Sequence, residues 1–436
     1  MEMFSRFAGC SGFFLDPDRF ARSFYAPEPF GHHLRPSKAL LSAVYLSSVA
    51  LSGDVTLTTH EPIFLSRALY YASQAPSCTH PSSVKHALQA EILIANYFFL
   101  RGHILEGKSH ICTAMLIATV HRAHKICRIS NLEGVGVIEQ WERVKGFWLA
   151  YFFDKLWSIA GCLPSTSPDG FTEETRIDAP WPLEPPQFKN VSIFLDVSIF
   201  RRPTLMNLVQ IQPEQEVRGY DTINRFLANP AASFAEEDVS TCTMACKAVI
   251  LFDRAHSFGL SWTAGLTFQS AVTGRDTYRF LFAPFTLATS DETRAGLRIE
   301  LAVMRQATQA FKDTIAPLAV GANIQDPLVT IHMMILLASI RLDVSPTWTK
   351  NSVENALAAV ALVDDTSFEY IGNVNPILGF LLTAVGQVLV DELIRIRGLA
   401  SKLEEDTEQE AKMKNATDRL TIALRACGAE CPYICE

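Results

Sequence analysis

The sequence lacks several of the short motifs that most directly identify an enzyme. It contains no G-x-S-x-G nucleophile elbow, no dinucleotide-binding G-x-G-x-x-G fingerprint and no H-E-x-x-H zinc helix. These strings would supply a nucleophile, a pyrophosphate cradle, or two metal ligands on one helix face. Their absence predicts no catalytic and no cofactor-binding residues, and we interpret the chain as a protein that is not an enzyme.

Positive charge is also scarce. The formal net charge is −8, and the densest basic clusters are Arg201 with Arg202 and Arg395 with Arg397. Because nucleic-acid phosphates are bound by clustered Lys and Arg, we do not expect this chain itself to contact DNA. The first residues contain no uninterrupted apolar stretch of signal-peptide length, so we do not expect secretion either.

The cysteines lack the spacing of a metal site. None of the ten cysteines forms a C-x-x-C pair. Cys242 and Cys246, and the trio Cys427, Cys431 and Cys435, have three residues between members, whereas zinc ribbons have two. We therefore predict no metal-binding residues and reduced thiols, as expected inside a cell.

One acidic string leaves an enzyme alternative open. Asp364 and Asp365 with Glu369 resemble the Mg²⁺-binding motif of all-α terpene synthases. That motif needs a carboxylate where this sequence has Phe368, and no second metal motif follows. An all-α Mg-dependent isoprenoid synthase is therefore the less favoured alternative.

Apolar residues recur mainly at helical spacing, as in Leu88, Ile92, Ala95 and Phe99. This pattern predicts an all-α, multi-helix bundle. The expected helices span 36–53, 84–101, 109–127, 139–160, 191–227, 239–258, 289–315, 327–342, 351–363 and 374–397. Repeated prolines predict an ordered loop at 163–188.

The expected organisation has an N-terminal helical half at 1–190, a C-terminal half at 191–400, and a charged, cysteine-containing tail at 401–436. The charge-rich stretch at 402–419 is expected to be a solvated helix or tail. The stretch from Tyr370 to Val390 carries no charge and is long enough to cross a membrane. Asn373, Pro376 and Gln387 interrupt it, however. We therefore interpret it as a buried core helix, with no membrane contact.

A sequence signature begins inside the helix expected at 139–160 and continues into the proline-rich loop. Its residues are Arg143, Trp148, Asp154, Gly161, Pro164, Ile177, Asp178, Pro180 and Pro182. It resembles the middle homology region of fungal zinc-cluster transcription factors, which reads as a basic pair, a tryptophan, an aspartate, a Gly-Arg-Pro turn and an Ile-Asp-x-Pro-x-Pro close. Two positions depart from that pattern: Val144 follows Arg143, and Cys162 and Leu163 stand where the turn has its arginine.

The resemblance extends over residues 12–182, where "GFFLDPDRF", "RPSKALLSAVYLSS" and the helix-rich 88–126 are similar to the version common in mushroom-forming fungi. It fits the remainder to about residue 400 less closely. We expect the signature residues to be structural, because buried aromatic side chains and paired buried charges usually serve architecture.

This resemblance implies the regulatory and interaction domain of a fungal transcription regulator, located in the nucleus. The family carries zinc in a separate N-terminal six-cysteine cluster, and nothing before Phe20 can supply it because Cys10 stands alone there. We therefore expect DNA to be reached only through a missing module. Expected partners are a second copy or a related regulator in a homo- or heterodimer, the transcription machinery, and a small-molecule effector. A stand-alone helical protein that binds partners or effectors is the main alternative.

Overall fold

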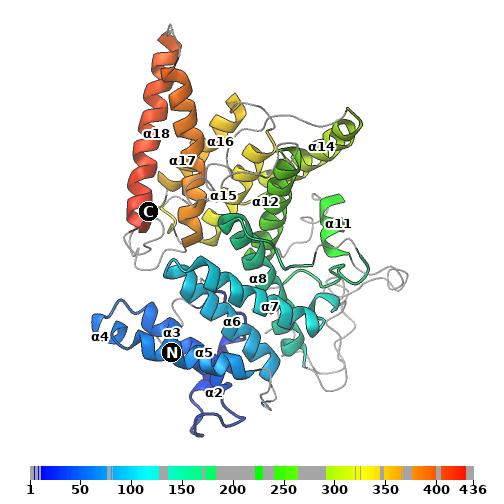
Figure 1. Ribbon diagram of the computed structural model, residues 1–436, viewed down its shortest axis with the longest axis vertical. Helices are drawn as coiled ribbons and strands as arrows, with labels where there is room; N and C mark the ends of the chain where they lie inside the picture. The colour runs from blue at the N-terminus through cyan, green and yellow to red at the C-terminus, as the bar shows by residue number, and fades with distance from the viewer. Residues whose placement is uncertain are drawn as a thin grey trace.

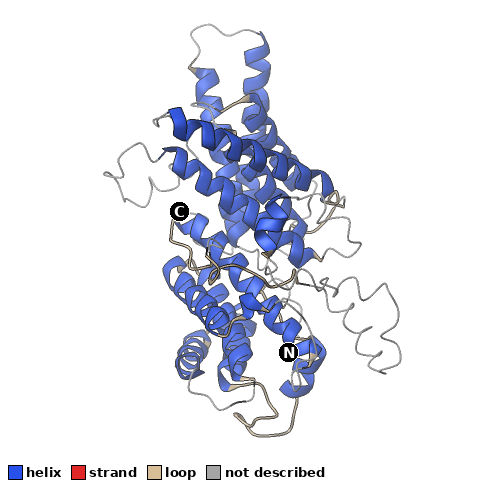
Figure 2. Cartoon of the chain, turned by 90° about the vertical axis from the view of Figure 1, so that its right-hand side faces the viewer, coloured by secondary structure: helices blue, strands red, loops and turns tan. Residues whose placement is uncertain are grey.

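A computed structural model describes residues 11–75, 82–126, 136–168, 172–182, 221–228, 240–263, 291–343, 348–364, 376–398 and 404–428, except 320 and 325, together with positions 4, 8, 80 and 366. Within these residues the regular elements are helices, and no strand occurs (Figure 2). The all-α prediction is therefore confirmed.

The N-terminal half forms one end of the molecule in Figure 1. Its α-helices are α2 (Pro17–Phe24), α3 (Lys38–Ala50), α4 (Val55–Thr58), α5 (Glu61–Gln74), α6 (Ser83–Leu100), α7 (Ile104–Val120) and α8 (Val137–Gly161). A short 3-10 helix at Ala123–Lys125 follows α7. Helix α3 packs against α5 and α6, and α7 packs against both α6 and α8. The order of packing thus largely follows the order along the chain.

The C-terminal half lies at the opposite end (Figure 1). Its described helices are α11 (Thr222–Ala228), α12 (Thr241–Thr263), α14 (Asp291–Thr314), α15 (Pro327–Arg341), α16 (Lys350–Asp364), α17 (Pro376–Arg397) and α18 (Glu404–Gly428). Helix α15 packs against α12 and α16, and α17 packs along α18. In Figure 1 the α17–α18 pair forms a long antiparallel hairpin.

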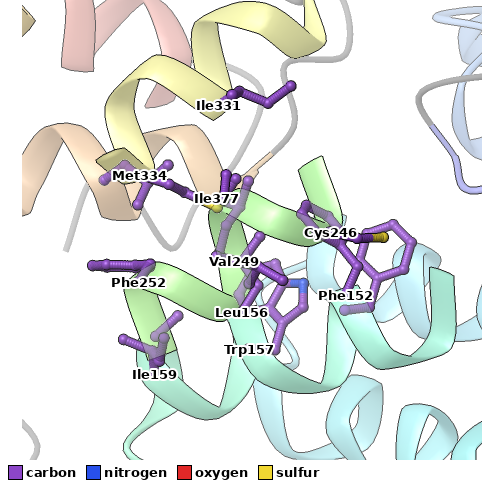
Figure 3. Packing of buried hydrophobic residues seen from close by; sticks show 14 of the residues in the cluster. Phe152, Leu156, Trp157, Ile159, Cys246, Val249, Phe252, Ile331, Met334 and Ile377 are labelled. Atoms are coloured by element: carbon purple, nitrogen blue, oxygen red, sulfur yellow. The ribbon is translucent and has the colours of Figure 1, made fainter. Parts of the chain in front are cut away.

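Helix α8 joins the two halves. At about 37 Å for its 25 residues, it contacts α6 and α7 on one side and α12 on the other. Trp157 of α8 stacks on Phe99 of α6, with ring centroids 3.9 Å apart. Figure 3 shows the packing between α8 and helices of the C-terminal half. The labelled side chains are Phe152, Leu156, Trp157 and Ile159 of α8, Cys246, Val249 and Phe252 of α12, Ile331 and Met334 of α15, and Ile377 of α17. Buried side chains of both halves therefore belong to one hydrophobic cluster.

Local sequence explains where several helices begin. The side chains of Asp16 and Asp326 accept hydrogen bonds from the first turns of α2 and α15, and Pro17 and Pro327 follow them. Ser37 caps α3 in the same way. An acceptor before the first turn satisfies an otherwise unpaired N–H, and proline loses nothing at that position.

Most expected helices are present with ends within a few residues of the prediction. The helix expected at 109–127 is α7, which begins at Ile104 and ends at Val120, and Gly107 lies inside it. A Cβ atom there would come within 2.4 Å of the Phe99 ring, so the glycine allows α6 and α7 to approach. Helices α2, α4 and α5 were not expected. Most of the helix expected at 191–227 lies outside the described residues.

Two C-terminal segments bear on the sequence expectations. Helix α17 is long and apolar enough to span a membrane, but 67% of its most apolar window is buried inside the protein, and a core helix passes the same test. The charged segment near the C-terminus is the helix α18. It is not solvated all round, because Met413, Ala416, Leu420 and Ala423 are buried.

Candidate functional site

Trp148 connects the two parts of the signature. It lies near the middle of α8, is fully buried, and donates its indole N–H to the Pro180 carbonyl at 2.7 Å. Its ring also stacks on Trp181, with centroids 4.6 Å apart. A tryptophan combines a large apolar surface with one donor that needs a partner when buried. The proline-rich segment is therefore held across α8 by both packing and a hydrogen bond.

Asp154 lies six residues further along α8, with its side chain fully buried. It forms an ion pair with Lys108 of α7. The Ser165, Thr166 and Ser167 hydroxyls donate to it at 2.7, 2.9 and 2.6 Å. The backbone N–H groups of Thr166 and Ser167 donate at 3.0 and 2.8 Å. One carboxylate thus fastens two helices and the loop that follows α8.

The electrostatics of Asp154 favour the charged form. Burial raises the pKa of this carboxyl, but the Lys108 charge and hydrogen bonds from Lys108, Ser167 and Ser165 together outweigh burial. The pKa therefore lies below its ordinary value of 3.8. A carboxyl of this kind is a structural anion rather than a general acid, which would need a raised pKa.

Asp178 organises the second half of the signature. Lys125 and Arg176 pair with it at 3.2 and 2.9 Å. The backbone N–H of Asp221 donates to it at 3.1 Å, and its own N–H donates to the His124 carbonyl at 2.8 Å. Burial again raises its pKa, but the Asp221 N–H and the two cations outweigh it and lower the pKa.

The Ile-Asp-x-Pro-x-Pro segment is also bonded to the C-terminal half through its carbonyl groups. The hydroxyls of Ser240 and Thr243 donate to Pro182 at 2.7 and 2.6 Å. The Thr222 hydroxyl donates to Ala179 at 2.7 Å, and its N–H donates to Ile177 at 2.8 Å. The segment therefore bridges α8 to α11 and α12.

Arg143, Gly161 and Pro164 stand apart from this network. Arg143 is half-exposed, and among the described residues it pairs only with Glu139, one turn earlier on α8. Gly161 ends α8 where a Cβ would come within 3.0 Å of Leu163, but the left-handed residue of the turn is Cys162, with φ of 51°. The N–H of Leu163 closes the turn on the Ser158 carbonyl at 2.9 Å, as in a Schellman motif. Pro164 lies exposed on the loop.

Lys108, the ion-pair partner of Asp154, is not predicted from the sequence, although it lies in a well-known sequence motif. Residues 102–109, "GHILEGKS", match the G-x-x-x-x-G-K-[ST] pattern of phosphate-binding loops. That chemistry needs a preceding strand and a loop of free backbone N–H groups. Here a helix, α6, precedes the string, and Gly107 and Lys108 lie inside α7. Because the Lys108 ammonium binds Asp154 and the Ser158 hydroxyl, the string forms a packing element.

Lys247 is a second missed residue. It lies on α12, is 1% exposed, and sits over the rings of Trp181 and Phe226 at 5.2 and 5.6 Å. Such contacts stabilise a buried cation. The neighbouring Cys246 donates its thiol to the Trp148 carbonyl at 3.7 Å. Only the fold brings these α12 side chains to the signature.

The acidic string is only partly described. Asp364 ends α16 and forms an ion pair with Arg419 of α18. Asp365 and Glu369 lie outside the described residues, as do Cys431 and Cys435. Within the described part of the chain, no group of three or more His, Cys, Asp or Glu side chains could hold a metal ion.

No protein-family model, curated protein or solved structure matches this chain. The function proposed below therefore rests on the residues and their geometry.

Proposed function

We propose that this chain is the regulatory and interaction domain of a fungal zinc-cluster-type transcription regulator and that it acts in the nucleus on DNA-templated transcription. In this proposal the chain works by binding rather than by catalysis. DNA is reached through a zinc-cluster module that this sequence does not contain. The partners are a second copy or a related regulator, the transcription machinery, and a small effector.

One observation supports the proposal more than any other. Trp148 on α8 and Pro180 in the proline-rich segment are joined by a 2.7 Å hydrogen bond. These are the two parts of the signature that define the family's middle homology region, and they are 32 residues apart. Two motifs that the family resemblance relates only by their order along the chain are therefore in direct contact in the fold.

A transcription reporter assay tests the proposal directly. The full chain is fused to a sequence-specific DNA-binding domain and expressed in a fungal host with a reporter gene under the matching sites. We expect reporter transcription to rise or fall several-fold relative to the DNA-binding domain alone. An Arg143→Gln fusion should behave like the parent, because Arg143 makes only a surface pair. An Asp154→Ala fusion should lose the effect.

A silent reporter would contradict the proposal, provided that the fusion is nuclear and as abundant as its control. Size measurement of the purified chain gives an independent readout of the dimer. A single-chain mass at every concentration would remove self-association from the proposal.

The alternative of a stand-alone partner-binding protein is favoured by a shallow hollow on α5. The hollow measures about 540 Å³ and is lined by Pro62, Ile63, Ser66, Arg67, Tyr70 and Tyr71. Ile63 and Tyr70 are more than half exposed, and Tyr and Arg are enriched at protein interfaces. If the reporter is silent, affinity capture with the parent and with Tyr70→Ala tests this alternative. A partner lost only from Tyr70→Ala would support it, and an identical set of captured proteins would not.

A further inference from the structure

The loop after α8 ends in a Ser-Pro pair. Ser-Pro occurs twice in the sequence, at Ser167 and at Ser345, and Ser345 lies outside the described residues. A serine followed by proline is the local pattern that proline-directed protein kinases select. Ser165 and Thr166 beside it are exposed, and Ser167 is half-buried. Pro168 itself is buried, so the pair lies at the inner edge of a surface loop that belongs to no helix.

The Ser167 hydroxyl already has a specific task. It donates to Asp154 at 2.6 Å, and its N–H donates to the same carboxylate at 2.8 Å. Asp154 is fully buried and carries a negative charge that Lys108 offsets. A phosphorylated serine has no hydroxyl proton to donate and adds about −1.5 to −2 charge at neutral pH. The added charge would lie directly against a buried carboxylate, where like-charge repulsion is least screened.

We propose that Ser167 is a phosphorylation site for a proline-directed kinase, and that its modification releases the 163–168 loop from Asp154. In this step the Ser167 hydroxyl oxygen attacks the γ-phosphorus of a nucleoside triphosphate. The bond from that phosphorus to the bridging oxygen breaks, the nucleoside diphosphate leaves, and the hydroxyl proton passes to the kinase's catalytic base. The site goes beyond the proposed function and does not rest on it.

Release of the 163–168 loop would affect both the Asp154 site and the segment that follows the loop. Asp154 would lose the donors of Ser165, Thr166 and Ser167, keeping only its pair with Lys108. The same loop leads into the segment that bonds Trp148 and α12. The modification therefore acts on the loop that leads from α8 into the segment crossing between the two halves, and segments freed in this way are opened more readily by proteases.

The test uses the purified full chain, a purified proline-directed kinase and Mg·ATP. We expect mass spectrometry to find phosphate on Ser167 in the parent and in the Ser345→Ala control, and none at this position in Ser167→Ala. We expect limited proteolysis between residues 163 and 182 to become about tenfold faster after phosphorylation and to return to its starting rate after phosphatase treatment.

A charge-matched pair separates repulsion from loss of the hydroxyl. Ser167→Glu should be cleaved faster than Ser167→Gln, because both remove the hydroxyl and only the first adds charge. Two results would overturn the inference. The first is a folded chain that takes no phosphate at Ser167 while a peptide covering 160–172 is phosphorylated. The second is a phosphorylated chain whose cleavage rate and melting temperature equal those of the parent.

Discussion

Two buried carboxylates in the signature are held in different ways. Asp154 binds one buried cation and a cluster of hydroxyl and backbone donors from the loop just after its own helix. Asp178 binds two cations, Lys125 and Arg176, that are about one fifth to one quarter exposed, together with a backbone N–H 43 residues away. Both carboxyls have a lowered pKa.

Asp154 therefore holds a loop that is close to it in the sequence, whereas Asp178 holds segments that are far apart in the sequence. The Asp154 site fastens a loop to the helix that precedes it, and its two charges are almost completely buried. The Asp178 site fixes where distant segments cross, and its cations remain partly hydrated. Buried pairs are screened little by salt, whereas partly exposed pairs are screened more. Variants at the two sites should therefore differ in size of effect and in salt dependence.

The largest effect is expected at Asp154. Asp154→Ala leaves the Lys108 ammonium buried without its charge partner and strands several donors, so we expect a loss of about 3–5 kcal/mol in unfolding free energy. Urea denaturation followed by circular dichroism measures it. Adding Lys108→Met to Asp154→Ala should recover part of the loss, because two neutral groups replace one uncompensated charge. A single-variant loss below about 1 kcal/mol would refute the buried-pair account.

Asp178→Asn should cost less, about 1–2 kcal/mol, because its cations can regain water. The difference from the parent should shrink between about 0.05 M and about 0.5 M salt as the pairs are screened. The corresponding difference for Asp154→Asn should stay nearly constant over the same range. Equal salt dependence at the two sites would remove the distinction between them.

Acid should weaken both sites in the same direction. The folded-state pKa of each carboxyl lies below its ordinary value of 3.8. Their contribution to stability is therefore present above that value and is lost as the pH falls through the lower folded-state pKa. We expect the unfolding free energy to fall below about pH 4, and Asp154→Asn to fall less steeply than the parent because it lacks one such group. Parallel pH profiles would argue against a lowered pKa at Asp154.

The smallest effect is expected at the turn that ends α8, next to the Asp154 site. Cys162 is exposed and takes a left-handed conformation that costs a residue with a Cβ atom. Cys162→Gly should raise the unfolding free energy by about 0.5–1 kcal/mol without changing the salt dependence that Asp178 confers. The control Arg143→Gln should stay within about 0.5 kcal/mol of the parent, since it removes one exposed pair. A destabilised Cys162→Gly would mean that the thiol makes a contact that outweighs its backbone strain.

Sequence patterns predicted the positions of the helices better than they predicted which side chains contact one another. Helical spacing located α3, α6, α8, α12, α15, α16 and α17, because the spacing of apolar residues along a helix can be recognised without knowing which element packs against it. The spacing did not locate α5, which buries few residues. It also placed the start of α7 too late, since a glycine that ends many helices instead packs here against Phe99.

The signature shows the same contrast, because its own residues were identified from the sequence and their binding partners were not. Trp148, Asp154 and Asp178 were singled out by residue type and order, and all three are buried and bonded. Arg143 belongs to the same sequence pattern but lies on the surface. The partners Lys108, Ser167 and Lys247 could not be assigned from the chain, because a hydroxyl or an ammonium group has no preferred sequence distance to the residue that it binds.

The sequence by itself determined that the described chain is helical, that α8 is apolar around most of its circumference, and that a proline-rich segment without helix follows it. These are short-range properties of backbone preference and apolar spacing. Tertiary structure alone decided that α8 joins the two halves, that Lys108 offsets Asp154, and that Ser240 and Thr243 bind Pro182. Such pairings depend on which surfaces meet when apolar area is buried, and buried polar groups must then find partners in whatever lies nearby.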